Sequence, residues 1–202
     1  MWNKDIIAIC DLKLFKNDEE FLSYIQKLSK SSIKTIIFRA KHLKEYVYYD
    51  IAKEVLSICN KNKITCFLHN FYDIALKLGH RFLHCPIDIL DQNINKYFKI
   101  IGTSIHDTNE LQKALDFKCN YAIFGHVFES NSKPNLSPKG LNLLELICNN
   151  GKIPIYAIGG INIENIASFK DINIAGVCMM SALNSNNDLK KYIKNCYKRL
   201  NS

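Results

Sequence analysis

The stretch from Tyr121 to Leu141 holds the residues with the clearest potential for chemistry. Its apolar start, Tyr121–Phe124, breaks at Gly125 into a polar loop that carries His126. Imidazole titrates near neutral pH, so a histidine here can take up a proton and return it within one turnover. Ionisable residues just past the end of a buried strand are a common site of chemistry in α/β proteins. His126 is therefore the first candidate acid–base residue, and the alternative is a loop histidine that is hydrogen-bonded for structure.

Two turns late in the chain have the character of a phosphate site. The apolar run Ile155–Ile158 leads into Gly159 and Gly160, and a second run ends at Met180 and Ser181. Glycines let backbone N–H groups approach an anion closely, and the start of a helix adds a partial positive charge. Loops after the last two strands are the usual phosphate site of barrel enzymes. We therefore expect these four residues to bind a substrate phosphate.

Further polar residues follow other predicted strands and are candidates for substrate binding. They are Arg39, Lys41, Asn70, Ser104, Ser130 and Lys133. For Arg39 and Lys41, a solvated loop is an equally good interpretation of the spacing. The sequence leaves open whether His69, His84 and His106 point into the site. Asp88 and Asp91 do not make a convincing metal arrangement, so no metal site is expected from the residues.

Short β-like runs alternate with helical patterns along the whole chain. The runs are rich in Ile, Val, Phe and Tyr without strict polar alternation, which is typical of strands that are covered on both faces. The predicted strands are Ile6–Cys10, Thr35–Phe38, Thr65–His69, Phe82–Cys85, Lys99–Thr103, Tyr121–Phe124, Ile155–Ile158 and Ala175–Met179. The predicted helices are Asp18–Ser31, Tyr48–Lys61, Tyr72–Leu78, Leu90–Tyr97, Asp107–Phe117, Leu141–Cys148, Asn162–Phe169 and Asp188–Leu200.

This alternation predicts the fold class. Eight strands, each followed by a helix, in 202 residues indicate a small (β/α)₈ barrel, the TIM barrel fold, as one domain over residues 1–202. An open doubly wound sheet is the alternative. It usually has a glycine-rich turn after the first strand, and Asp11-Leu12-Lys13 is not one.

Composition narrows the class of protein. The longest apolar runs are too short to span a bilayer, and the first residues do not form a signal peptide, so we expect a cytoplasmic protein without a membrane partner. The 8 cysteines form no C-x-x-C pair and fall in apolar or helical runs, as reduced buried cysteines do. The net charge of +8 is spread over the predicted helices, which argues against a nucleic-acid partner and fits attraction of small anions.

The order of these residues resembles the thiamine-phosphate synthase/TenI superfamily along essentially the whole chain. The most specific parts are the Gly125 loop and the turn Ile158-Gly159-Gly160-Ile161. The other matching parts are Arg39-x-Lys41, Asn70, Gly125-x-Val127-Phe128, Lys133-Pro134, Gly140-Leu141 and Met180-Ser181-Ala182. The resemblance implies a small (β/α)₈ barrel, in agreement with the strand count. Superfamily members are often homodimers, and the sequence leaves the oligomeric state open.

The resemblance offers two activities. Synthases join a hydroxymethylpyrimidine diphosphate to a thiazole phosphate with Mg²⁺, and typically carry Q-x-R-E-K, N-D and G-P-[IV]-[FY]-P-T-x-T-K motifs. Here Ile37, Ala40 and Phe71 replace the Gln, the Glu and the metal-binding Asp. Phenylalanine cannot bind Mg²⁺, which requires oxygen ligands.

The TenI-type branch instead has a histidine where the synthases have proline, as at His126. We therefore expect a thiazole tautomerase, an isomerase of thiamine biosynthesis. The resemblance implies that His126 moves protons to aromatise a thiazole carboxylate phosphate, without metal or other cofactor. The alternatives are a divergent thiamine-phosphate synthase, a transferase that uses Mg²⁺, and a non-catalytic barrel that binds a phosphate ligand.

Overall fold

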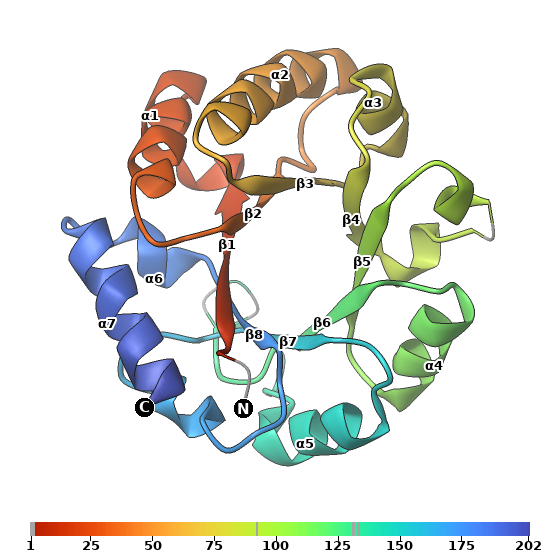
Figure 1. Cartoon of the computed structure of the whole chain (residues 1–202), viewed down its shortest axis with the longest axis vertical. Coiled ribbons are helices and arrows are strands. Elements are labelled where there is room, and N and C mark those ends of the chain that lie inside the picture. Colours follow the sequence, from red (N-terminus) through yellow and green to blue (C-terminus); the bar gives the residue numbers. More distant parts are fainter. Residues whose placement is uncertain (1–2, 92, 131, 133) are drawn as a thin grey trace.

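The chain folds into a closed barrel of eight parallel strands with helices around it (Figure 1). The computed structural model describes residues 3–91, 93–130, 132 and 134–202. Each strand pairs with its neighbours in sequence order, and β1 pairs with β8 to close the ring. The strands are β1 (Asp5–Asp11), β2 (Thr35–Arg39), β3 (Thr65–His69), β4 (Phe82–Pro86), β5 (Ile100–Ile105), β6 (Tyr121–Gly125), β7 (Ile155–Ile158) and β8 (Gly176–Met179). The predicted fold class is confirmed.

Seven α-helices of the described residues lie outside the strands. They are α1 (Asp18–Ser29), α2 (Glu45–Lys61), α3 (Tyr72–Lys77), α4 (Thr108–Asp116), α5 (Gly140–Asn150), α6 (Ser181–Asn184) and α7 (Leu189–Asn201). Several begin at side-chain caps, which satisfy N–H groups that have no partner within the helix. Asn17 accepts from the N–H of Glu20 at 2.9 Å, and Asp107 accepts from that of Glu110 at 2.9 Å.

Two predicted helices are wrong in extent. Among the described residues of Leu90–Tyr97 the helical structure is limited to the 3₁₀ turn η3 (Ile94–Lys96), and η2 (Ile87–Ile89) precedes this segment. Asn162–Phe169 contains only η4 (Ile166–Phe169). At both places a short side chain accepts hydrogen bonds from nearby backbone and so competes with helix formation. Asp91 Oδ1 accepts from Ile94 N at 2.9 Å, and Asn162 Oδ1 accepts from Glu164 N at 2.8 Å.

Successive side chains along each strand belong alternately to two apolar clusters, one outside the barrel wall and one inside it. Ile6, Ala8 and Cys10 of β1 pack outward under the helices, whereas Ile7 and Ile9 belong to a smaller cluster inside the barrel. The same period of two places Ile37, Phe67, Tyr121, Ile123 and Cys178 inside. All eight cysteines are buried and have free thiols, as the sequence predicts.

None of the helices in the described part of the chain combines the length and apolar character that crossing a bilayer requires. A 3₁₀ turn, η1 (Leu12–Leu14), follows β1, and the side chain of Asp11 caps it.

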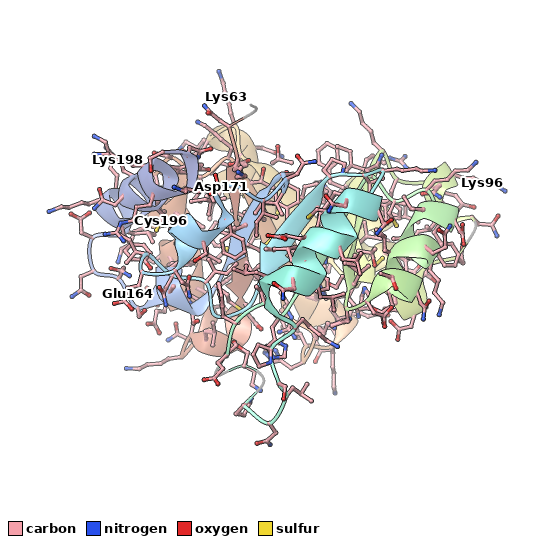
Figure 2. All side chains as sticks on the ribbon, turned by 90° about the horizontal axis from the view of Figure 1, so that it is seen from below. Lys63, Lys96, Glu164, Asp171, Cys196 and Lys198 are labelled. Carbon is pink, nitrogen blue, oxygen red and sulfur yellow. The ribbon has the colours of Figure 1, made fainter. Side chains whose placement is uncertain are left out.

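Figure 2 shows lysines on opposite sides of the molecule, among them Lys63, Lys96 and Lys198, standing out from the surface. The positive charge is thus dispersed over the helices and loops around the barrel.

Candidate active site at the carboxyl end of the barrel

Polar side chains gather where the first five strands end. Alternation along each strand directs Asp11, Arg39, His69, His84 and Ser104 to the inside of the barrel, at or near the carboxyl ends of β1 to β5. Catalytic residues of TIM barrels lie at this end of the strands. We call this end of the barrel, with the loops that leave it, the carboxyl-end mouth.

Arg39 and Asp11 form an ion pair in the mouth. The guanidinium Nη1 donates to Asp11 Oδ2, and the other carboxylate oxygen accepts from the N–H of Lys13 at 3.1 Å. Lys41 lies two residues further on and is exposed. Partial burial, followed by the neighbouring Arg39 guanidinium, lowers the pKa of Lys41, while Asp88 and Asp11 act in the opposite direction. This side of the mouth therefore has two cations and two carboxylates within electrostatic range.

His84 is a neutral histidine with both ring nitrogens hydrogen-bonded. Its Nδ1 lies 3.1 Å from the Tyr121 hydroxyl, and its Nε2 lies 3.0 Å from Ser104 Oγ. Burial, with a smaller contribution from Lys41, lowers its pKa to about 3. Burial also raises the pKa of Tyr121, so its hydroxyl keeps a proton to donate to Nδ1. Nε2–H then donates to Ser104, and the serine proton is left for a ligand.

His69 carries a buried polar atom without a partner. The residue is 6% exposed, and its Nδ1 has no hydrogen bond to the described residues. Its ring lies 5.6 Å from that of His84. Burial, followed by the charge effects of His84, Lys41 and Arg39, lowers the pKa of His69 to about 2. Asn70 comes next, at φ +77°, with its N–H bonded to His84 O at 3.0 Å.

The turn after β7 packs tightly against the loop after β6. A Cβ at Gly159 would lie 2.2 Å from the Cβ of His126, and one at Gly160 would lie 2.2 Å from the carbonyl of Glu129. Both glycines have positive φ. Within the described residues, the N–H groups of Gly159, Gly160 and Ser181 have no hydrogen-bond acceptor. Unpaired N–H groups on adjacent strand ends suit an anion.

His126 holds the loop between β6 and α5. Its side chain is 5% exposed, and Nε2 lies 3.1 Å from the carbonyl of Leu136. A carbonyl only accepts, so Nε2 carries the proton. The His126 carbonyl accepts from the N–H of Lys139 at 2.8 Å. The loop projects from the carboxyl end of the barrel, at the bottom of Figure 2.

The other expected site residues differ in their burial and in their contacts. Met180 is half-buried at the end of β8 and packs on the inner cluster, and Ser181 is exposed. Ser130 is half-buried and accepts from the N–H of Ser132 in its own loop at 3.3 Å. Lys133 lies outside the described residues. His106 pairs with Glu110 of α4 at 2.9 Å, so it differs from the inward-facing His69 and His84.

The sequence does not identify Asp11 as part of the mouth, nor Tyr121 as the partner of His84. The local pattern indicates only a turn at Asp11 and the first residue of a strand at Tyr121. The alternation of the strands holds a signal for both, because Asp11 continues the inward series Ile7, Ile9, and Tyr121 is two residues before the inward-facing Ile123. Their partners, however, lie 28 and 37 residues away in sequence.

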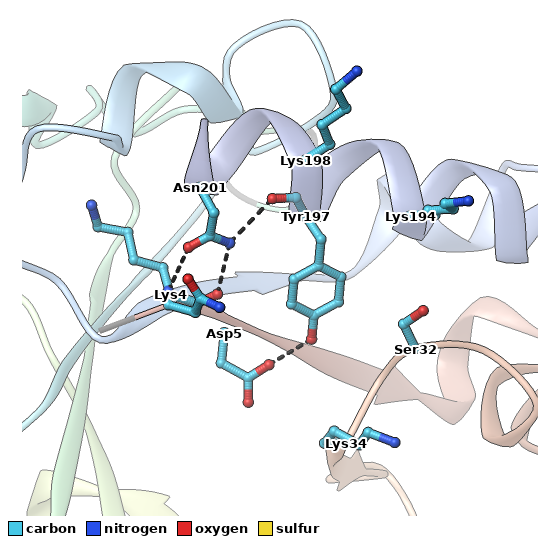
Figure 3. Close-up of a pocket in the computed structure, with 9 residues that line it drawn as sticks. Lys4, Asp5, Ser32, Lys34, Lys194, Tyr197, Lys198 and Asn201 are labelled. Atoms are coloured by element: carbon cyan, nitrogen blue, oxygen red, sulfur yellow. Dashed lines mark hydrogen bonds between the residues drawn. The ribbon is translucent and has the colours of Figure 1, made fainter. Parts of the chain in front are cut away.

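A cavity of about 560 Å³ lies at the opposite, amino-terminal end of the barrel. Figure 3 shows it between the start of β1 and α7, with Lys34, Lys194 and Lys198 around it. The Tyr197 hydroxyl donates to the Asp5 carboxylate there at 2.5 Å, which ties α7 to β1. Catalysis in TIM barrels takes place at the carboxyl end, and this cavity lies at the other end. We assign it no role in catalysis.

Comparison with known proteins identifies the family. The model of the thiamine monophosphate synthase family matches residues 6–183. The chain belongs to this family. A thiamine-phosphate synthase of Fusobacterium nucleatum is 29% identical over 190 residues, which cover 92% of each chain. One of Clostridium tetani is 32% identical over 157 residues, 76% of this chain and 75% of the relative.

A solved structure has the same fold. A thiamine phosphate pyrophosphorylase from Pyrococcus furiosus superposes with a TM-score of 0.83 over 98% of this chain and 96% of that one, at 21% identity. The barrel of this family is therefore the barrel seen here.

These relatives correct the functional expectation. A thiazole tautomerase with His126 as acid and base is wrong, because the relatives are named thiamine-phosphate synthase, which favours the synthase alternative. The hydrogen bond from His126 to Leu136 gives the histidine a structural role within its loop instead. The superfamily resemblance itself is confirmed, although a particular closeness to the TenI-type branch is not supported.

The residues of the mouth do not fit the Mg²⁺ that the family resemblance implies. Phe71 follows Asn70, and its ring packs 4.2 Å from that of Tyr48. The described residues contain no group of three His, Cys, Asp or Glu that could hold a metal ion. Mg²⁺ requires several oxygen ligands in octahedral geometry, and its usual protein ligands are carboxylates.

Proposed function

We propose that this chain is a thiamine-phosphate synthase, which joins a pyrimidine diphosphate to a thiazole phosphate and releases diphosphate. A bond forms between the pyrimidine methylene carbon and the thiazole nitrogen. The carbon–oxygen bond to the diphosphate breaks, and its electron pair leaves with the diphosphate. The observation that carries the proposal is the family match over residues 6–183, with relatives of that name aligned along nearly the whole chain.

The first half of the mouth suits the diphosphate. Arg39 and Lys41 supply positive charge there, and Asn70 adds an amide at the end of β3. A leaving group that gains negative charge as its bond breaks is stabilised by cations that are already in place. In our proposal, Arg39 and Lys41 bind the diphosphate and assist its departure.

The turns after β7 and β8 suit the thiazole phosphate. The free N–H groups of Gly159, Gly160 and Ser181 would donate to the phosphate oxygens, and Met180 would pack beside the ring. This leaves the two anionic groups on different sides of the mouth. The reacting carbon and nitrogen would meet between them, so that binding alone orients the attack.

Ser104 is placed to recognise the pyrimidine. Its hydroxyl accepts from His84, so its own proton is available to a ring nitrogen of the ligand. The neutral histidine fixes the direction of that proton without adding charge to the site. Ser130, in the loop after β6, is proposed to contribute to the substrate contacts, as is Lys133, which lies outside the described residues.

The test is product formation by the purified protein. We expect thiamine phosphate and equimolar diphosphate when both substrates are present, measured by chromatography after oxidation to fluorescent thiochrome. Ser104→Ala should lower kcat/KM roughly tenfold, the effect of one lost hydrogen bond of about 1.4 kcal/mol. Ser32→Ala, an exposed serine at the opposite end of the barrel, is the matched control. Absence of product both with Mg²⁺ and with a chelator would overturn the proposal.

A further inference from the structure

The residue after Asn70 is Phe71, whose ring packs against an aromatic side chain of α2 and supplies no metal ligand. The Phe71 ring lies 4.2 Å from Tyr48, and Tyr48 stacks 4.8 Å from Phe38 and is fully buried. The backbone holds this arrangement, because the N–H of Asn70 bonds to His84 O at 3.0 Å and that of Tyr72 to Asn70 O at 3.1 Å. The end of β3 therefore offers no carboxylate at this position.

The carboxylates that remain near this side are already compensated by protein cations. Asp11 is 5% exposed, and its two oxygens accept from Arg39 and from the N–H of Lys13. Asp88, in η2, is exposed and lies within electrostatic range of Lys41. A metal ion bound here would displace Arg39 or meet the repulsion of Lys41.

The neighbouring histidines add no attraction for a metal ion of this kind. Both nitrogens of His84 are hydrogen-bonded. The unpartnered Nδ1 of His69 is a nitrogen, whereas Mg²⁺ prefers oxygen. Arg39 and Lys41 both lie on this side of the mouth, and each repels a free cation.

We propose that the carboxyl-end mouth holds a diphosphate group with Arg39 and Lys41 in place of a divalent metal ion. The inference rests on the proposed function for the nature of the ligand. It goes beyond that function in stating that the charge of the departing diphosphate is balanced by protein side chains. Binding of diphosphate then needs no metal, and added Mg²⁺ competes with the protein for the anion.

The experiment titrates the full chain with inorganic diphosphate by calorimetry, in chelator and in Mg²⁺. We expect binding in chelator and equal or weaker binding in Mg²⁺. Lys41→Met should weaken binding by about 10- to 100-fold, the effect of one lost charge-assisted hydrogen bond. Lys34→Met, beside the cavity at the amino-terminal end, should leave binding unchanged. Binding that appears only with Mg²⁺, or that is lost in Lys34→Met and not in Lys41→Met, overturns the proposal.

A gain of metal dependence provides a second arm. Phe71→Asp restores a carboxylate at the end of β3, and Phe71→Asn removes the same ring packing without adding a charge. Only Phe71→Asp should bind diphosphate more tightly in Mg²⁺ than in chelator, with thermal melts confirming that both variants are folded. A wild type that already shows this preference for Mg²⁺ contradicts the inference. Because no second substrate is present, failure of this test is distinct from failure of the synthase assay.

Discussion

At the scale of single residues, burial sets the protonation states inside the barrel. His69 and His84 are 6% and 2% exposed, and burial is the largest cause that lowers their pKa values to about 2 and about 3. Both rings are therefore neutral at physiological pH. The His84 ring acts as hydrogen-bond donor and acceptor, while the positive charge of the mouth comes from Arg39 and Lys41.

The depressed pKa values predict loss of stability in mild acid. The unfolded chain takes up protons on both histidines below pH 6.5, whereas the folded chain does not until about pH 3, so stability falls as the pH decreases through this window. Each histidine should lower the free energy of unfolding by about 2 kcal/mol at pH 5 relative to pH 7.5. Urea unfolding at both pH values measures it. His84→Gln should reduce the difference by that amount, and an unchanged difference would contradict the prediction.

At the scale of elements, the turn after β7 and the loop after β6 form one packed unit. The N–H groups of Val127 and Phe128 bond to the carbonyls of Ile158 and Gly159 at 2.8 and 3.1 Å. Gly159 has φ +108°, and it has no room for a side chain because His126 lies against it. The glycine pair thus serves loop packing as well as any phosphate, a role that its sequence pattern does not reveal.

Gly159→Ala tests this packing. The new Cβ would overlap the Cβ of His126 in a strained backbone conformation, so we expect a loss of about 3 kcal/mol or more in the free energy of unfolding. Gly79→Ala is the matched control. Gly79 also has positive φ, at +65°, but a Cβ added there would have no atom within 4 Å, so the substitution should cost only about 1 kcal/mol. Equal losses in denaturant unfolding would show that backbone strain alone matters.

At the scale of the whole molecule, closure of the barrel depends on segments from both ends of the chain. β1 pairs with β8, and α7 covers this seam (Figure 1). Tyr197 donates to Asp5, and Asn201 bonds to Lys4 through both its side-chain oxygen and nitrogen. The buried face of α7 consists of Leu189, Ile193, Cys196 and Leu200.

Removal of α7 should therefore unfold the protein. Burial of an aliphatic side chain contributes about 1.5–3 kcal/mol, so the helix supplies much of the roughly 5–15 kcal/mol that a domain has in total. A chain that ends at Asn187 should show no cooperative melt by circular dichroism. Exposed substitutions on the same helix, Lys190→Ala and Lys191→Ala, should keep the melt of the parent. A truncated chain with an unchanged melting temperature would refute this dependence.

The fold class and the glycine turns can be predicted from the amino-acid sequence, because they depend on local patterns. Apolar runs that alternate with 3.6-period segments mark strands and helices, and glycines mark the turns at their ends. Each predicted strand agrees with the observed one to within two residues at each end, and Thr65–His69 and Ile155–Ile158 agree at both ends. The same local patterns placed Arg39, Asn70 and Ser104 at strand ends.

The contacts of those residues could not be predicted from the sequence and emerge from the three-dimensional fold. Arg39 pairs with Asp11 across 28 residues, and His84 meets Tyr121 across 37. Such contacts depend on the register between parallel strands and on closure of the ring, which no local pattern encodes. The role of His126 also required the fold, since its partner Leu136 is fixed by the path of a loop and not by periodicity.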